Sequence, residues 1–361
     1  MAIKERSFRI GSGRYVQEAG AIEKCGEEVL RLGRAPFIIG GKTALSVAGE
    51  RITDSILKSC KKYETAVYTG TCNDEEARRF SEYAKDNGFD VIVGVGGGVM
   101  MDFAKLCGYY SELPVLNIPT SCATCAAYTP LSVRYTKDGE TVGTLHYTYE
   151  VDGVIADSDI LRRAPVRLFL SGVFDSLAKY IEIQHRYKES DKTYTMGLDY
   201  AYATSRRLFD FLMENTEGCI GDIRSGERSD RLENAFFSLI AVTGTVSGIA
   251  RGSDQTALAH KLYEITRLLY PRESRGYLHG ELVGIGLLLQ CRYNGDLATE
   301  KVISSLMRKY GMPSSPRAVG IPKDSLSAYL ERISGSSAME HATGEEYERL
   351  KESLEYLWRL N

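Results

Sequence analysis

The chain has 361 residues, of which 43% are hydrophobic and 26% are charged, and its formal net charge at pH 7 is −3. These values are typical of a globular protein and leave room for two domains, while the slightly acidic balance argues against a nucleic-acid partner. No apolar run approaches a membrane span, and neither the polar start Met1–Arg6 nor the eight scattered cysteines suggests secretion, so we expect a cytoplasmic protein that binds no membrane.

The first half of the chain alternates between strand and helix patterns. Acidic residues at Asp74–Glu76 favour the start of a helix there. The predicted strands are 35–41, 65–68, 90–95 and 114–120, and the predicted helices among them are 44–60, 74–87 and 99–106. This alternation is typical of a parallel sheet with helices on both faces, and the ligands of such sheets bind beyond the carboxyl ends of the strands. Gly40, Gly96 and Thr120 lie at such ends.

The glycine run Gly96–Gly98 lies between a strand pattern and a helical pattern that contains Asp102 and Lys105. Glycines let the backbone approach an anion, and a helix N-terminus offers N–H groups with a partial positive charge. The spacing matches neither the G-x-G-x-x-G pattern nor the Walker pattern. We therefore predict a pyrophosphate site at this turn, with a tight turn that binds no ligand as the alternative.

From Ser158 onward the patterns are helical, with almost no strand pattern. The clearest predicted helices are 173–187, 194–214, 229–246, 256–269 and 281–293. His146 falls before this change, in an expected hairpin strand over 141–146. The sequence thus predicts two domains, an α/β domain over residues 1–157 and an all-helical domain over residues 158–361.

Three side chains of the helical half could meet at a metal ion. Asp175 is expected near a helix start, His260 lies in an apolar helical stretch, and His279 begins another helix. A carboxylate and two imidazoles make a ligand set of nitrogen and oxygen that leaves one coordination position open. The alternatives are that each histidine is a hydrogen-bonded core residue and that Asp175 is a helix cap.

Four motifs, in this order, carry a resemblance to a known family. They are the G-G-G-x-x-x-D-x-x-K pattern over Gly96–Lys105, the loop Pro119–Tyr135, the G-x-x-D-x-L pattern over Gly172–Leu177, and the pair formed by His260 and the His279–Glu281 segment. The chain thereby resembles the iron-containing alcohol dehydrogenase superfamily, in its glycerol dehydrogenase-like branch. The resemblance implies a Rossmann-like, dehydroquinate synthase-like α/β domain and an all-α metal-binding domain, with NAD(P)(H) as the cofactor and a small molecule as the substrate.

The resemblance also implies which residues bind the nucleotide. They are Gly40, Gly41, Lys42, Gly97, Gly98, Asp102, Lys105, Thr120, Ala123, Thr124, Thr129, Leu131 and Tyr135. Members of the family that prefer NAD place an aspartate after the first strand to bind the adenosine ribose, whereas this chain has Gly40–Thr43 there. Lys42 could neutralise a 2′-phosphate, so we predict that NADP(H) is accepted and preferred over NAD(H). The alternative is that Lys42 is a solvated surface lysine and that both cofactors work.

Two further positions bear on the substrate. Glycerol dehydrogenases carry an aspartate at the position of Cys125, and a thiol cannot accept the charge-strengthened hydrogen bonds by which a carboxylate holds hydroxyl groups. Lys179 stands where iron-binding members have a fourth ligand, a histidine, and its ammonium could take part in catalysis by pairing with a substrate carboxylate. Alternatively it forms a structural salt bridge with Asp175 or Glu182. The loop Ala123–Val133 is also similar to that of hydroxycarboxylate dehydrogenases, so we expect a 2-oxo acid and its 2-hydroxy acid.

The resemblance makes Asp175, His260 and His279 the metal ligands at the catalytic centre. Three protein ligands with one position free favour zinc, with ferrous iron as the alternative. The metal would act as a Lewis acid toward the substrate oxygen while the nicotinamide exchanges hydride. No residue of the sequence stands out as a general base. The C-x-x-C pair Cys122 and Cys125 has no second such pair in the chain, so we expect neither redox chemistry nor a structural zinc there.

The sequence leaves other functions open. A glycerol or related polyol dehydrogenase, or a glycerol-1-phosphate dehydrogenase, would use the same chemistry on another substrate. A lyase or cyclase like the dehydroquinate synthase relatives of this fold would need a cluster of cations around a phosphate, where this chain offers little beyond Lys179, Arg251 and Lys261. A binding protein with a vestigial site is opposed by the intact set of predicted ligands. We also expect a homo-oligomer, because relatives commonly assemble.

Overall fold

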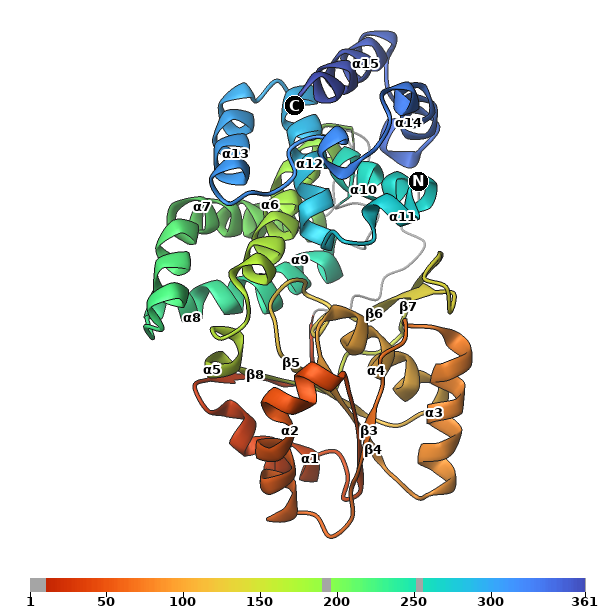
Figure 1. Cartoon of the computed structure of the whole chain (residues 1–361), viewed down its shortest axis with the longest axis vertical. Helices are drawn as coiled ribbons and strands as arrows, with labels where there is room; N and C mark the ends of the chain where they lie inside the picture. The colour runs from red at the N-terminus through yellow and green to blue at the C-terminus, as the bar shows by residue number, and fades with distance from the viewer. Residues whose placement is uncertain (1–10, 190–195, 251–255, 361) are drawn as a thin grey trace. The chain divides into compact units, whose positions relative to one another are not determined.

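The computed structural model describes residues 11–189, 196–250 and 256–360 (Figure 1). Tyr194, at the predicted start of a helix, and Arg251, one of the cations considered above, lie outside the described residues. The chain forms two compact units. We call them the sheet unit, which contains Ser7–Phe169 and Met213–Gly248, and the helical unit, which contains Leu170–Leu212 and Ile249–Asn361.

The sheet unit is built on one parallel sheet, as the sequence predicted. Its strands are β1 (Tyr15–Glu18), β2 (Pro36–Gly40), β3 (Glu64–Val67), β4 (Val91–Gly96), β5 (Val115–Pro119) and β8 (Gly153–Asp157), in the spatial order β1-β8-β5-β4-β2-β3. Every neighbouring pair is parallel. The strands β6 (Leu131–Tyr135) and β7 (Thr141–His146) form a separate antiparallel hairpin, which confirms the strand expected around His146. The sequence had not indicated β1, β8 or the helix α1 (Cys25–Leu30).

Helices cover both faces of this sheet (Figure 1). The helices and the 3₁₀ turn involved are η1 (Ala21–Lys24), α1 (Cys25–Leu30), α2 (Lys42–Leu57), α3 (Asp74–Asp86) and α4 (Gly98–Ser111). Aliphatic side chains of α1 and α2 bury one face, against strand residues such as Ile38 and Val93. On the other face the rings of Tyr68 and Phe103 stack with centroids 3.9 Å apart. Burial on both faces explains why the central strands are almost purely apolar.

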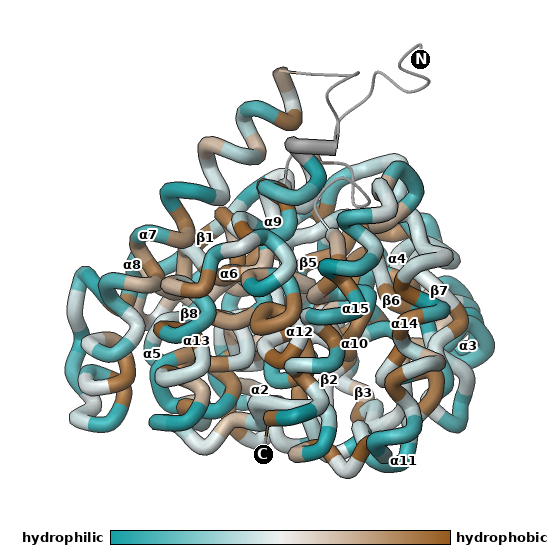
Figure 2. Tube along the Cα trace, turned by 90° about the horizontal axis from the view of Figure 1, so that it is seen from above, coloured by the Kyte–Doolittle hydropathy of each residue, from teal (hydrophilic) through white to brown (hydrophobic). Residues whose placement is uncertain are grey.

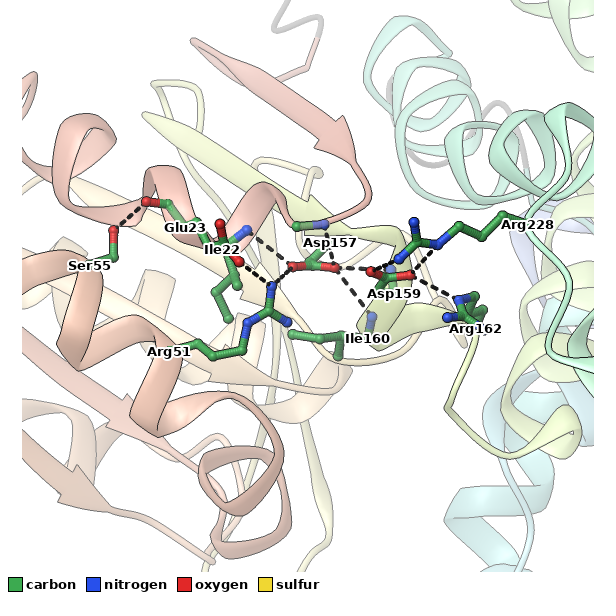
Figure 3. A network of polar contacts seen from close by, with 10 residues as sticks. Ile22, Glu23, Arg51, Ser55, Asp157, Asp159, Ile160, Arg162 and Arg228 are labelled. Atoms are coloured by element: carbon green, nitrogen blue, oxygen red, sulfur yellow. Dashed lines mark hydrogen bonds and ion pairs between the residues drawn. The ribbon is translucent and has the colours of Figure 1, made fainter.

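A buried carboxylate fixes the end of β8, where the predicted α/β domain ends (Figure 3). Asp157 has no exposed surface, and its two oxygens accept hydrogen bonds from the Ile22 N–H at 3.2 Å, the Asp159 N–H at 2.9 Å and the Arg51 guanidinium at 3.2 Å. The adjacent Asp159 binds Arg228 at 2.6 Å. Arg228 belongs to the segment 213–248, which the sequence had placed with the helical half and which groups with the sheet unit in the structure.

The second half of the chain is helical, as predicted, and contains no strand among the described residues after Asp157. Its helices are α5 (Ser158–Leu161), α6 (Val166–Glu189), α7 (Met196–Ser225), α8 (Asp230–Phe237), α9 (Thr243–Ile249), α10 (Leu258–Leu269), α11 (Pro271–Ser274), α12 (His279–Tyr293), α13 (Leu297–Lys309), α14 (Leu326–Ser334) and α15 (Gly344–Arg359). Hydrophobic and hydrophilic residues alternate along α7 (Figure 2), as expected of a helix with one packed face. In α12, by contrast, 13 of the 15 residues are buried, so this helix forms the core of the helical unit.

One helical run among the described residues, Asp230–Ile249, is long and apolar enough to cross a membrane by length and composition, although no such run was expected from the sequence. It comprises α8, the π-helical turn η2 (Ser238–Val242) and α9. Within its most apolar window, 61% of the residues are buried inside the protein. A core helix passes the same test, so the run is weak support for a membrane span.

Candidate metal centre and nucleotide-binding loops

The three predicted metal ligands come from three helices of the helical unit. Asp175 lies well inside α6, which begins at Val166, so the expectation that Asp175 is near a helix start, and the alternative that it caps a helix, are both wrong. His260 is the third residue of α10, and His279 is the first residue of α12, as predicted. Residues far apart in the sequence meet here only because these three helices pack together.

Two glycines of α12 allow that packing. A Cβ atom on Gly280 would lie 1.8 Å from the backbone oxygen of Ser171 in α6, and one on Gly286 would lie 2.4 Å from the backbone oxygen of Ala259 in α10. Either contact is shorter than real Cβ contacts, so larger residues would force the helices apart. The Gly280 N–H also donates to the Ser171 hydroxyl at 3.1 Å. The helix that carries His279 is thereby fixed against the helix that carries Asp175.

The geometry of the three side chains suits a metal ion. Asp175 Oδ1 lies 3.4 Å from His260 Nε2 and 3.4 Å from His279 Nε2, and all three ligand atoms lie within 4.8 Å of one another. Oδ1 is buried and accepts no hydrogen bond of good geometry from the residues that the structure describes. A tetrahedral ion with ligand bonds of about 2.1 Å would hold its ligand atoms about 3.4 Å apart. The donor set and its spacing therefore fit zinc or ferrous iron.

Charges around this cluster balance one another. Burial disfavours the Asp175 carboxylate, but Lys179, whose Nζ lies 3.7 Å from Oδ1, and then His279 and His260, hold the pKa of Asp175 well below the usual range. Burial also acts to lower the pKa of His260, yet the nearby carboxylates of Glu182 and Asp175 outweigh it and raise the pKa to about 9. For His279, burial prevails over the attraction of Asp175 and lowers the pKa.

Glu182 is a residue of this site that the sequence analysis did not place in it. It has no exposed surface, and its Oε2 accepts a hydrogen bond from His260 Nδ1 at 2.5 Å. The sequence offered one signal, since Glu182 follows Asp175 by two helical turns and so shares its face of the helix. His185, which was given no role, is buried near the end of α6, where its Nε2 lies 2.9 Å from the Ala338 carbonyl.

In the sheet unit, the turn Gly96–Gly98 joins β4 to α4 as predicted. Gly97 is the N-cap of α4 and has no side-chain hydrogen bond that would occupy the helix N-terminus. A Cβ atom on Gly98 would lie 2.8 Å from the Thr124 hydroxyl, so this glycine lets the loop Pro119–Tyr135, which contains the second group of predicted cofactor residues, approach the helix start. The first N–H groups of α4 therefore have the surroundings that a pyrophosphate requires.

The signature residues Asp102 and Lys105 are buried and hold the second predicted cofactor loop in place. Lys105 Nζ lies 2.9 Å from Asp102 Oδ1 and donates to the carbonyl oxygens of Thr129, at 2.9 Å, and Leu131. Asp102 Oδ2 accepts the Val133 N–H at 3.1 Å. These contacts join α4 to the start of β6, so both residues can act on a cofactor by positioning this loop.

Of the other predicted cofactor residues, Gly41, Lys42 and Thr120 directly follow the carboxyl ends of parallel strands, where ligands of such sheets bind. Gly41 is the N-cap of α2 without a side-chain cap, and Lys42 is the exposed first residue of that helix. Thr120 directly follows β5, and the partly buried residues Ala123, Thr124 and Tyr135 belong to the loop and to β6.

The cysteines of the C-x-x-C segment are buried thiols. No disulfide joins any of the eight cysteines, all of which the structure describes. Burial raises the pKa of Cys122 to about 12, against a weaker opposing hydrogen bond from the backbone, so a thiolate is disfavoured there. Cys125 lies in the loop and is 8% exposed.

Comparisons with known proteins identify the family of the chain. The family model described as iron-containing alcohol dehydrogenase matches residues 12–158. A glycerol dehydrogenase of Thermotoga maritima is 31% identical over 314 residues, which cover 86% of this chain and 84% of the relative. The chain belongs to the iron-containing alcohol dehydrogenase family. It is therefore a dehydrogenase, and the expected membership is confirmed.

Further dehydrogenases match over most of the chain. Hydroxycarboxylate dehydrogenase A of Escherichia coli is 27% identical over 291 residues, which cover 79% of this chain and 77% of the relative. The crystal structure of glycerol dehydrogenase from Schizosaccharomyces pombe superposes with a TM-score of 0.84 at 23% identity, covering 98% of this chain and 90% of that one. The fold is thus shared with glycerol dehydrogenases, which confirms the predicted fold class.

Proposed function

We propose that this protein is a metal-dependent NAD(P)(H) oxidoreductase that interconverts a small 2-oxo acid and the corresponding 2-hydroxy acid. Membership of the family supports the reaction class, and the triad of Asp175, His260 and His279 supports the metal. The observation that carries the substrate class is the ammonium of Lys179, 3.7 Å from Asp175 and buried beside the triad. A cation at this position suits a substrate carboxylate, and Cys125 lacks the carboxylate that would repel one.

The residues of the chain would divide the work. Asp175, His260 and His279 would hold the ion, which when bound supplies Lewis-acid stabilisation of negative charge on the substrate oxygen. Lys179 would orient the substrate by pairing with its carboxylate, so that binding energy from the acid group is used to fix the reacting carbon. His279, whose side chain is 27% exposed while the other two ligands are buried, forms the accessible edge of the cluster.

We propose zinc as the first choice of metal and ferrous iron as the second, because three protein ligands with a free position are typical of catalytic zinc. For the cofactor we propose NADP(H), with NAD(H) also accepted. The absence of an acidic side chain at Gly40–Thr43 and the exposed cation of Lys42 support this choice. A cytoplasmic location and a homo-oligomer remain proposals from the sequence.

The test begins with cofactor consumption. Purified protein loaded with zinc or ferrous iron would be offered NADH or NADPH and a panel of small 2-oxo acids, ketols, aldehydes, glycerol and dihydroxyacetone. We expect the highest kcat/KM with a 2-oxo acid. Lys179→Ala should raise KM for 2-oxo acids at least tenfold, since one charge-assisted pair contributes about 1.5–3 kcal/mol. It should change KM for neutral ketones by less than about threefold. An equal rise in KM for charged and for neutral substrates would contradict the proposed pairing of Lys179 with a substrate carboxylate.

Glycerol or a related polyol is the second candidate substrate. It is favoured by the 31% identity to the Thermotoga maritima glycerol dehydrogenase. Cys125→Asp should raise activity toward glycerol and lower it toward 2-oxo acids, whereas the matched variant Cys125→Asn, of the same shape without the charge, should not favour glycerol. A wild-type enzyme that already prefers glycerol to every 2-oxo acid would make glycerol the first candidate substrate and the 2-oxo acids the second.

A further inference from the structure

The start of helix α10, which carries His260, is capped by a carboxylate from another helix. The Oε1 atom of Glu182 accepts the N–H of Ala257 at 2.7 Å and the N–H of His260 at 2.9 Å. Ala257 is the N-cap residue and His260 is the third residue of the helix. These are the two N–H groups that a capping box normally satisfies with local side chains. Ala257 has no side-chain acceptor of its own, so the carboxylate of Glu182 determines where α10 begins.

The second oxygen of the same carboxylate controls the imidazole. Glu182 Oε2 accepts from His260 Nδ1 at 2.5 Å, while His260 Nε2 is the nitrogen that faces Asp175 Oδ1 at 3.4 Å. A proton held on Nδ1 leaves the lone pair of the neutral ring on Nε2, the atom in the triad. Glu182 is fully buried, so water does not compete for either oxygen.

We propose that Glu182 is a positioning residue that fixes, with one carboxylate, both the start of α10 and the ring orientation and tautomer of His260. Asp175 and Glu182 lie two turns apart on α6, so one rigid helix would provide a ligand and the support of a second ligand. This inference rests on the proposed metal site, since its consequence is a metal held more tightly. A hydrogen-bonded carboxylate also makes the imidazole a stronger ligand, and losing such a support typically weakens metal binding by about 10- to 100-fold.

A neighbouring residue that also caps α10 offers a control, and its amide NH₂ group additionally donates to Asn294 Oδ1 at 3.0 Å. Gln290 of α12 is fully buried, and its Oε1 accepts the N–H of Leu258, the first residue of α10, at 2.8 Å. It therefore caps the same helix as Glu182. Unlike Glu182, however, it makes no hydrogen bond to the ring of His260 among the contacts of the described residues. Gln290→Met should loosen the helix start and leave the tautomer of His260 unchanged.

The decisive variant is Glu182→Gln. Its amide oxygen could still accept the backbone N–H groups, but its NH₂ group would then face His260 Nδ1. That nitrogen would have to accept a hydrogen bond, which moves the proton of the neutral ring to Nε2 and blocks the ligand atom. Glu182→Asp is a second variant in case the first does not fold. It keeps the charge but is shorter by one methylene, so its carboxylate should reach either the N–H groups of α10 or the ring of His260, but not both. We therefore expect a loss of zinc affinity smaller than that of Glu182→Gln.

Two readouts test the proposal. The affinity for Zn²⁺, measured by competition with a chromophoric chelator, should fall at least tenfold in Glu182→Gln and less than threefold in Gln290→Met. In metal-free protein, the far-downfield proton NMR signal of His260 Nδ1–H should be present in the wild type and in Gln290→Met and lost in Glu182→Gln. Equal zinc affinities of Glu182→Gln and the wild type, equal losses in both variants, or a persistent Nδ1 signal would overturn it. Because the NMR signal needs no metal, a wild type that binds no zinc or iron would refute the proposed function without deciding the role of Glu182 in holding the ring.

Discussion

Gly280→Ala adds a single methyl group at the point where the helix of His279 meets the helix of Asp175. The new Cβ would lie 1.8 Å from the backbone oxygen of Ser171, whereas real Cβ contacts are at least 3.0 Å. The two backbones would therefore have to separate by at least about 1.2 Å, because no side-chain rotation can relieve a clash with a backbone atom.

Two effects of opposite sign set the stability of this variant. Alanine favours a helix over glycine by about 1 kcal/mol. Overpacking of a well-packed core costs about 1–3 kcal/mol, and more where the backbone must move. We therefore expect Gly280→Ala to lower the free energy of unfolding of the helical unit by about 2 kcal/mol. The effect on the metal should be larger, since ligand distances must lie within about 0.2 Å of their ideal values and His279 is the residue next to Gly280.

The assay compares Gly280→Ala with Gly284→Ala, one turn further along the same helix. There the new Cβ would meet only the ends of side chains, the Met307 Cε at 3.2 Å and the ring of Phe174 at 3.3 Å, which can shift. Urea unfolding and zinc affinity would be measured for both variants. We expect at least a 100-fold loss of zinc affinity in Gly280→Ala and a loss below tenfold in Gly284→Ala. If Gly280→Ala bound zinc as tightly as the wild type, the close approach of α6 and α12 would not be what builds the site.

Three further predictions concern the metal, the cofactor and pH. Removal of metal with a chelator should abolish turnover, and added Zn²⁺ or Fe²⁺ should restore it; activity that persists in protein shown to be metal-free would exclude the proposed mechanism. Lys42→Ala should raise KM for NADPH about fivefold, corresponding to about 1 kcal/mol for an exposed charge pair, and leave KM for NADH unchanged. Burial of Asp159 raises its pKa, but hydrogen bonds and charge from Arg162 and Arg228 outweigh this effect and leave the pKa below the usual carboxyl value. The ion pairs of Asp159 with these two arginines therefore stabilise the fold above about pH 4, the ordinary aspartate range. This contribution to the free energy of unfolding is lost as the pH falls further. Asp159→Asn should cost about 1 kcal/mol at pH 7 in urea unfolding and progressively less toward pH 3, and a constant difference across that range would contradict the assignment.

Local patterns in the sequence were enough to indicate the architecture and most of the predicted site. Strand and helix alternation predicted the parallel sheet, because each element buries an apolar face whose period is visible in a short window. The turn Gly96–Gly98 was recognisable because a glycine run between a strand pattern and a helical pattern favours a tight turn. Asp175, His260 and His279 were found from their residue types and their order, which chemistry and the family resemblance constrain.

Only the tertiary structure decided what depends on contacts between distant segments. The strand β1 pairs with β8, which lies far along the chain, and its polar sequence Tyr15–Glu18 carries no strand period by itself. The placement of residues 213–248 with the sheet rests partly on the ion pair of Arg228 with Asp159. In the same way, nothing in the sequence distinguishes Glu182 from any other glutamate in a helix, and its role becomes visible only when α10 packs against α6. A sequence window reports which face of an element is apolar, but the partner of a buried charge is fixed only when the helices pack.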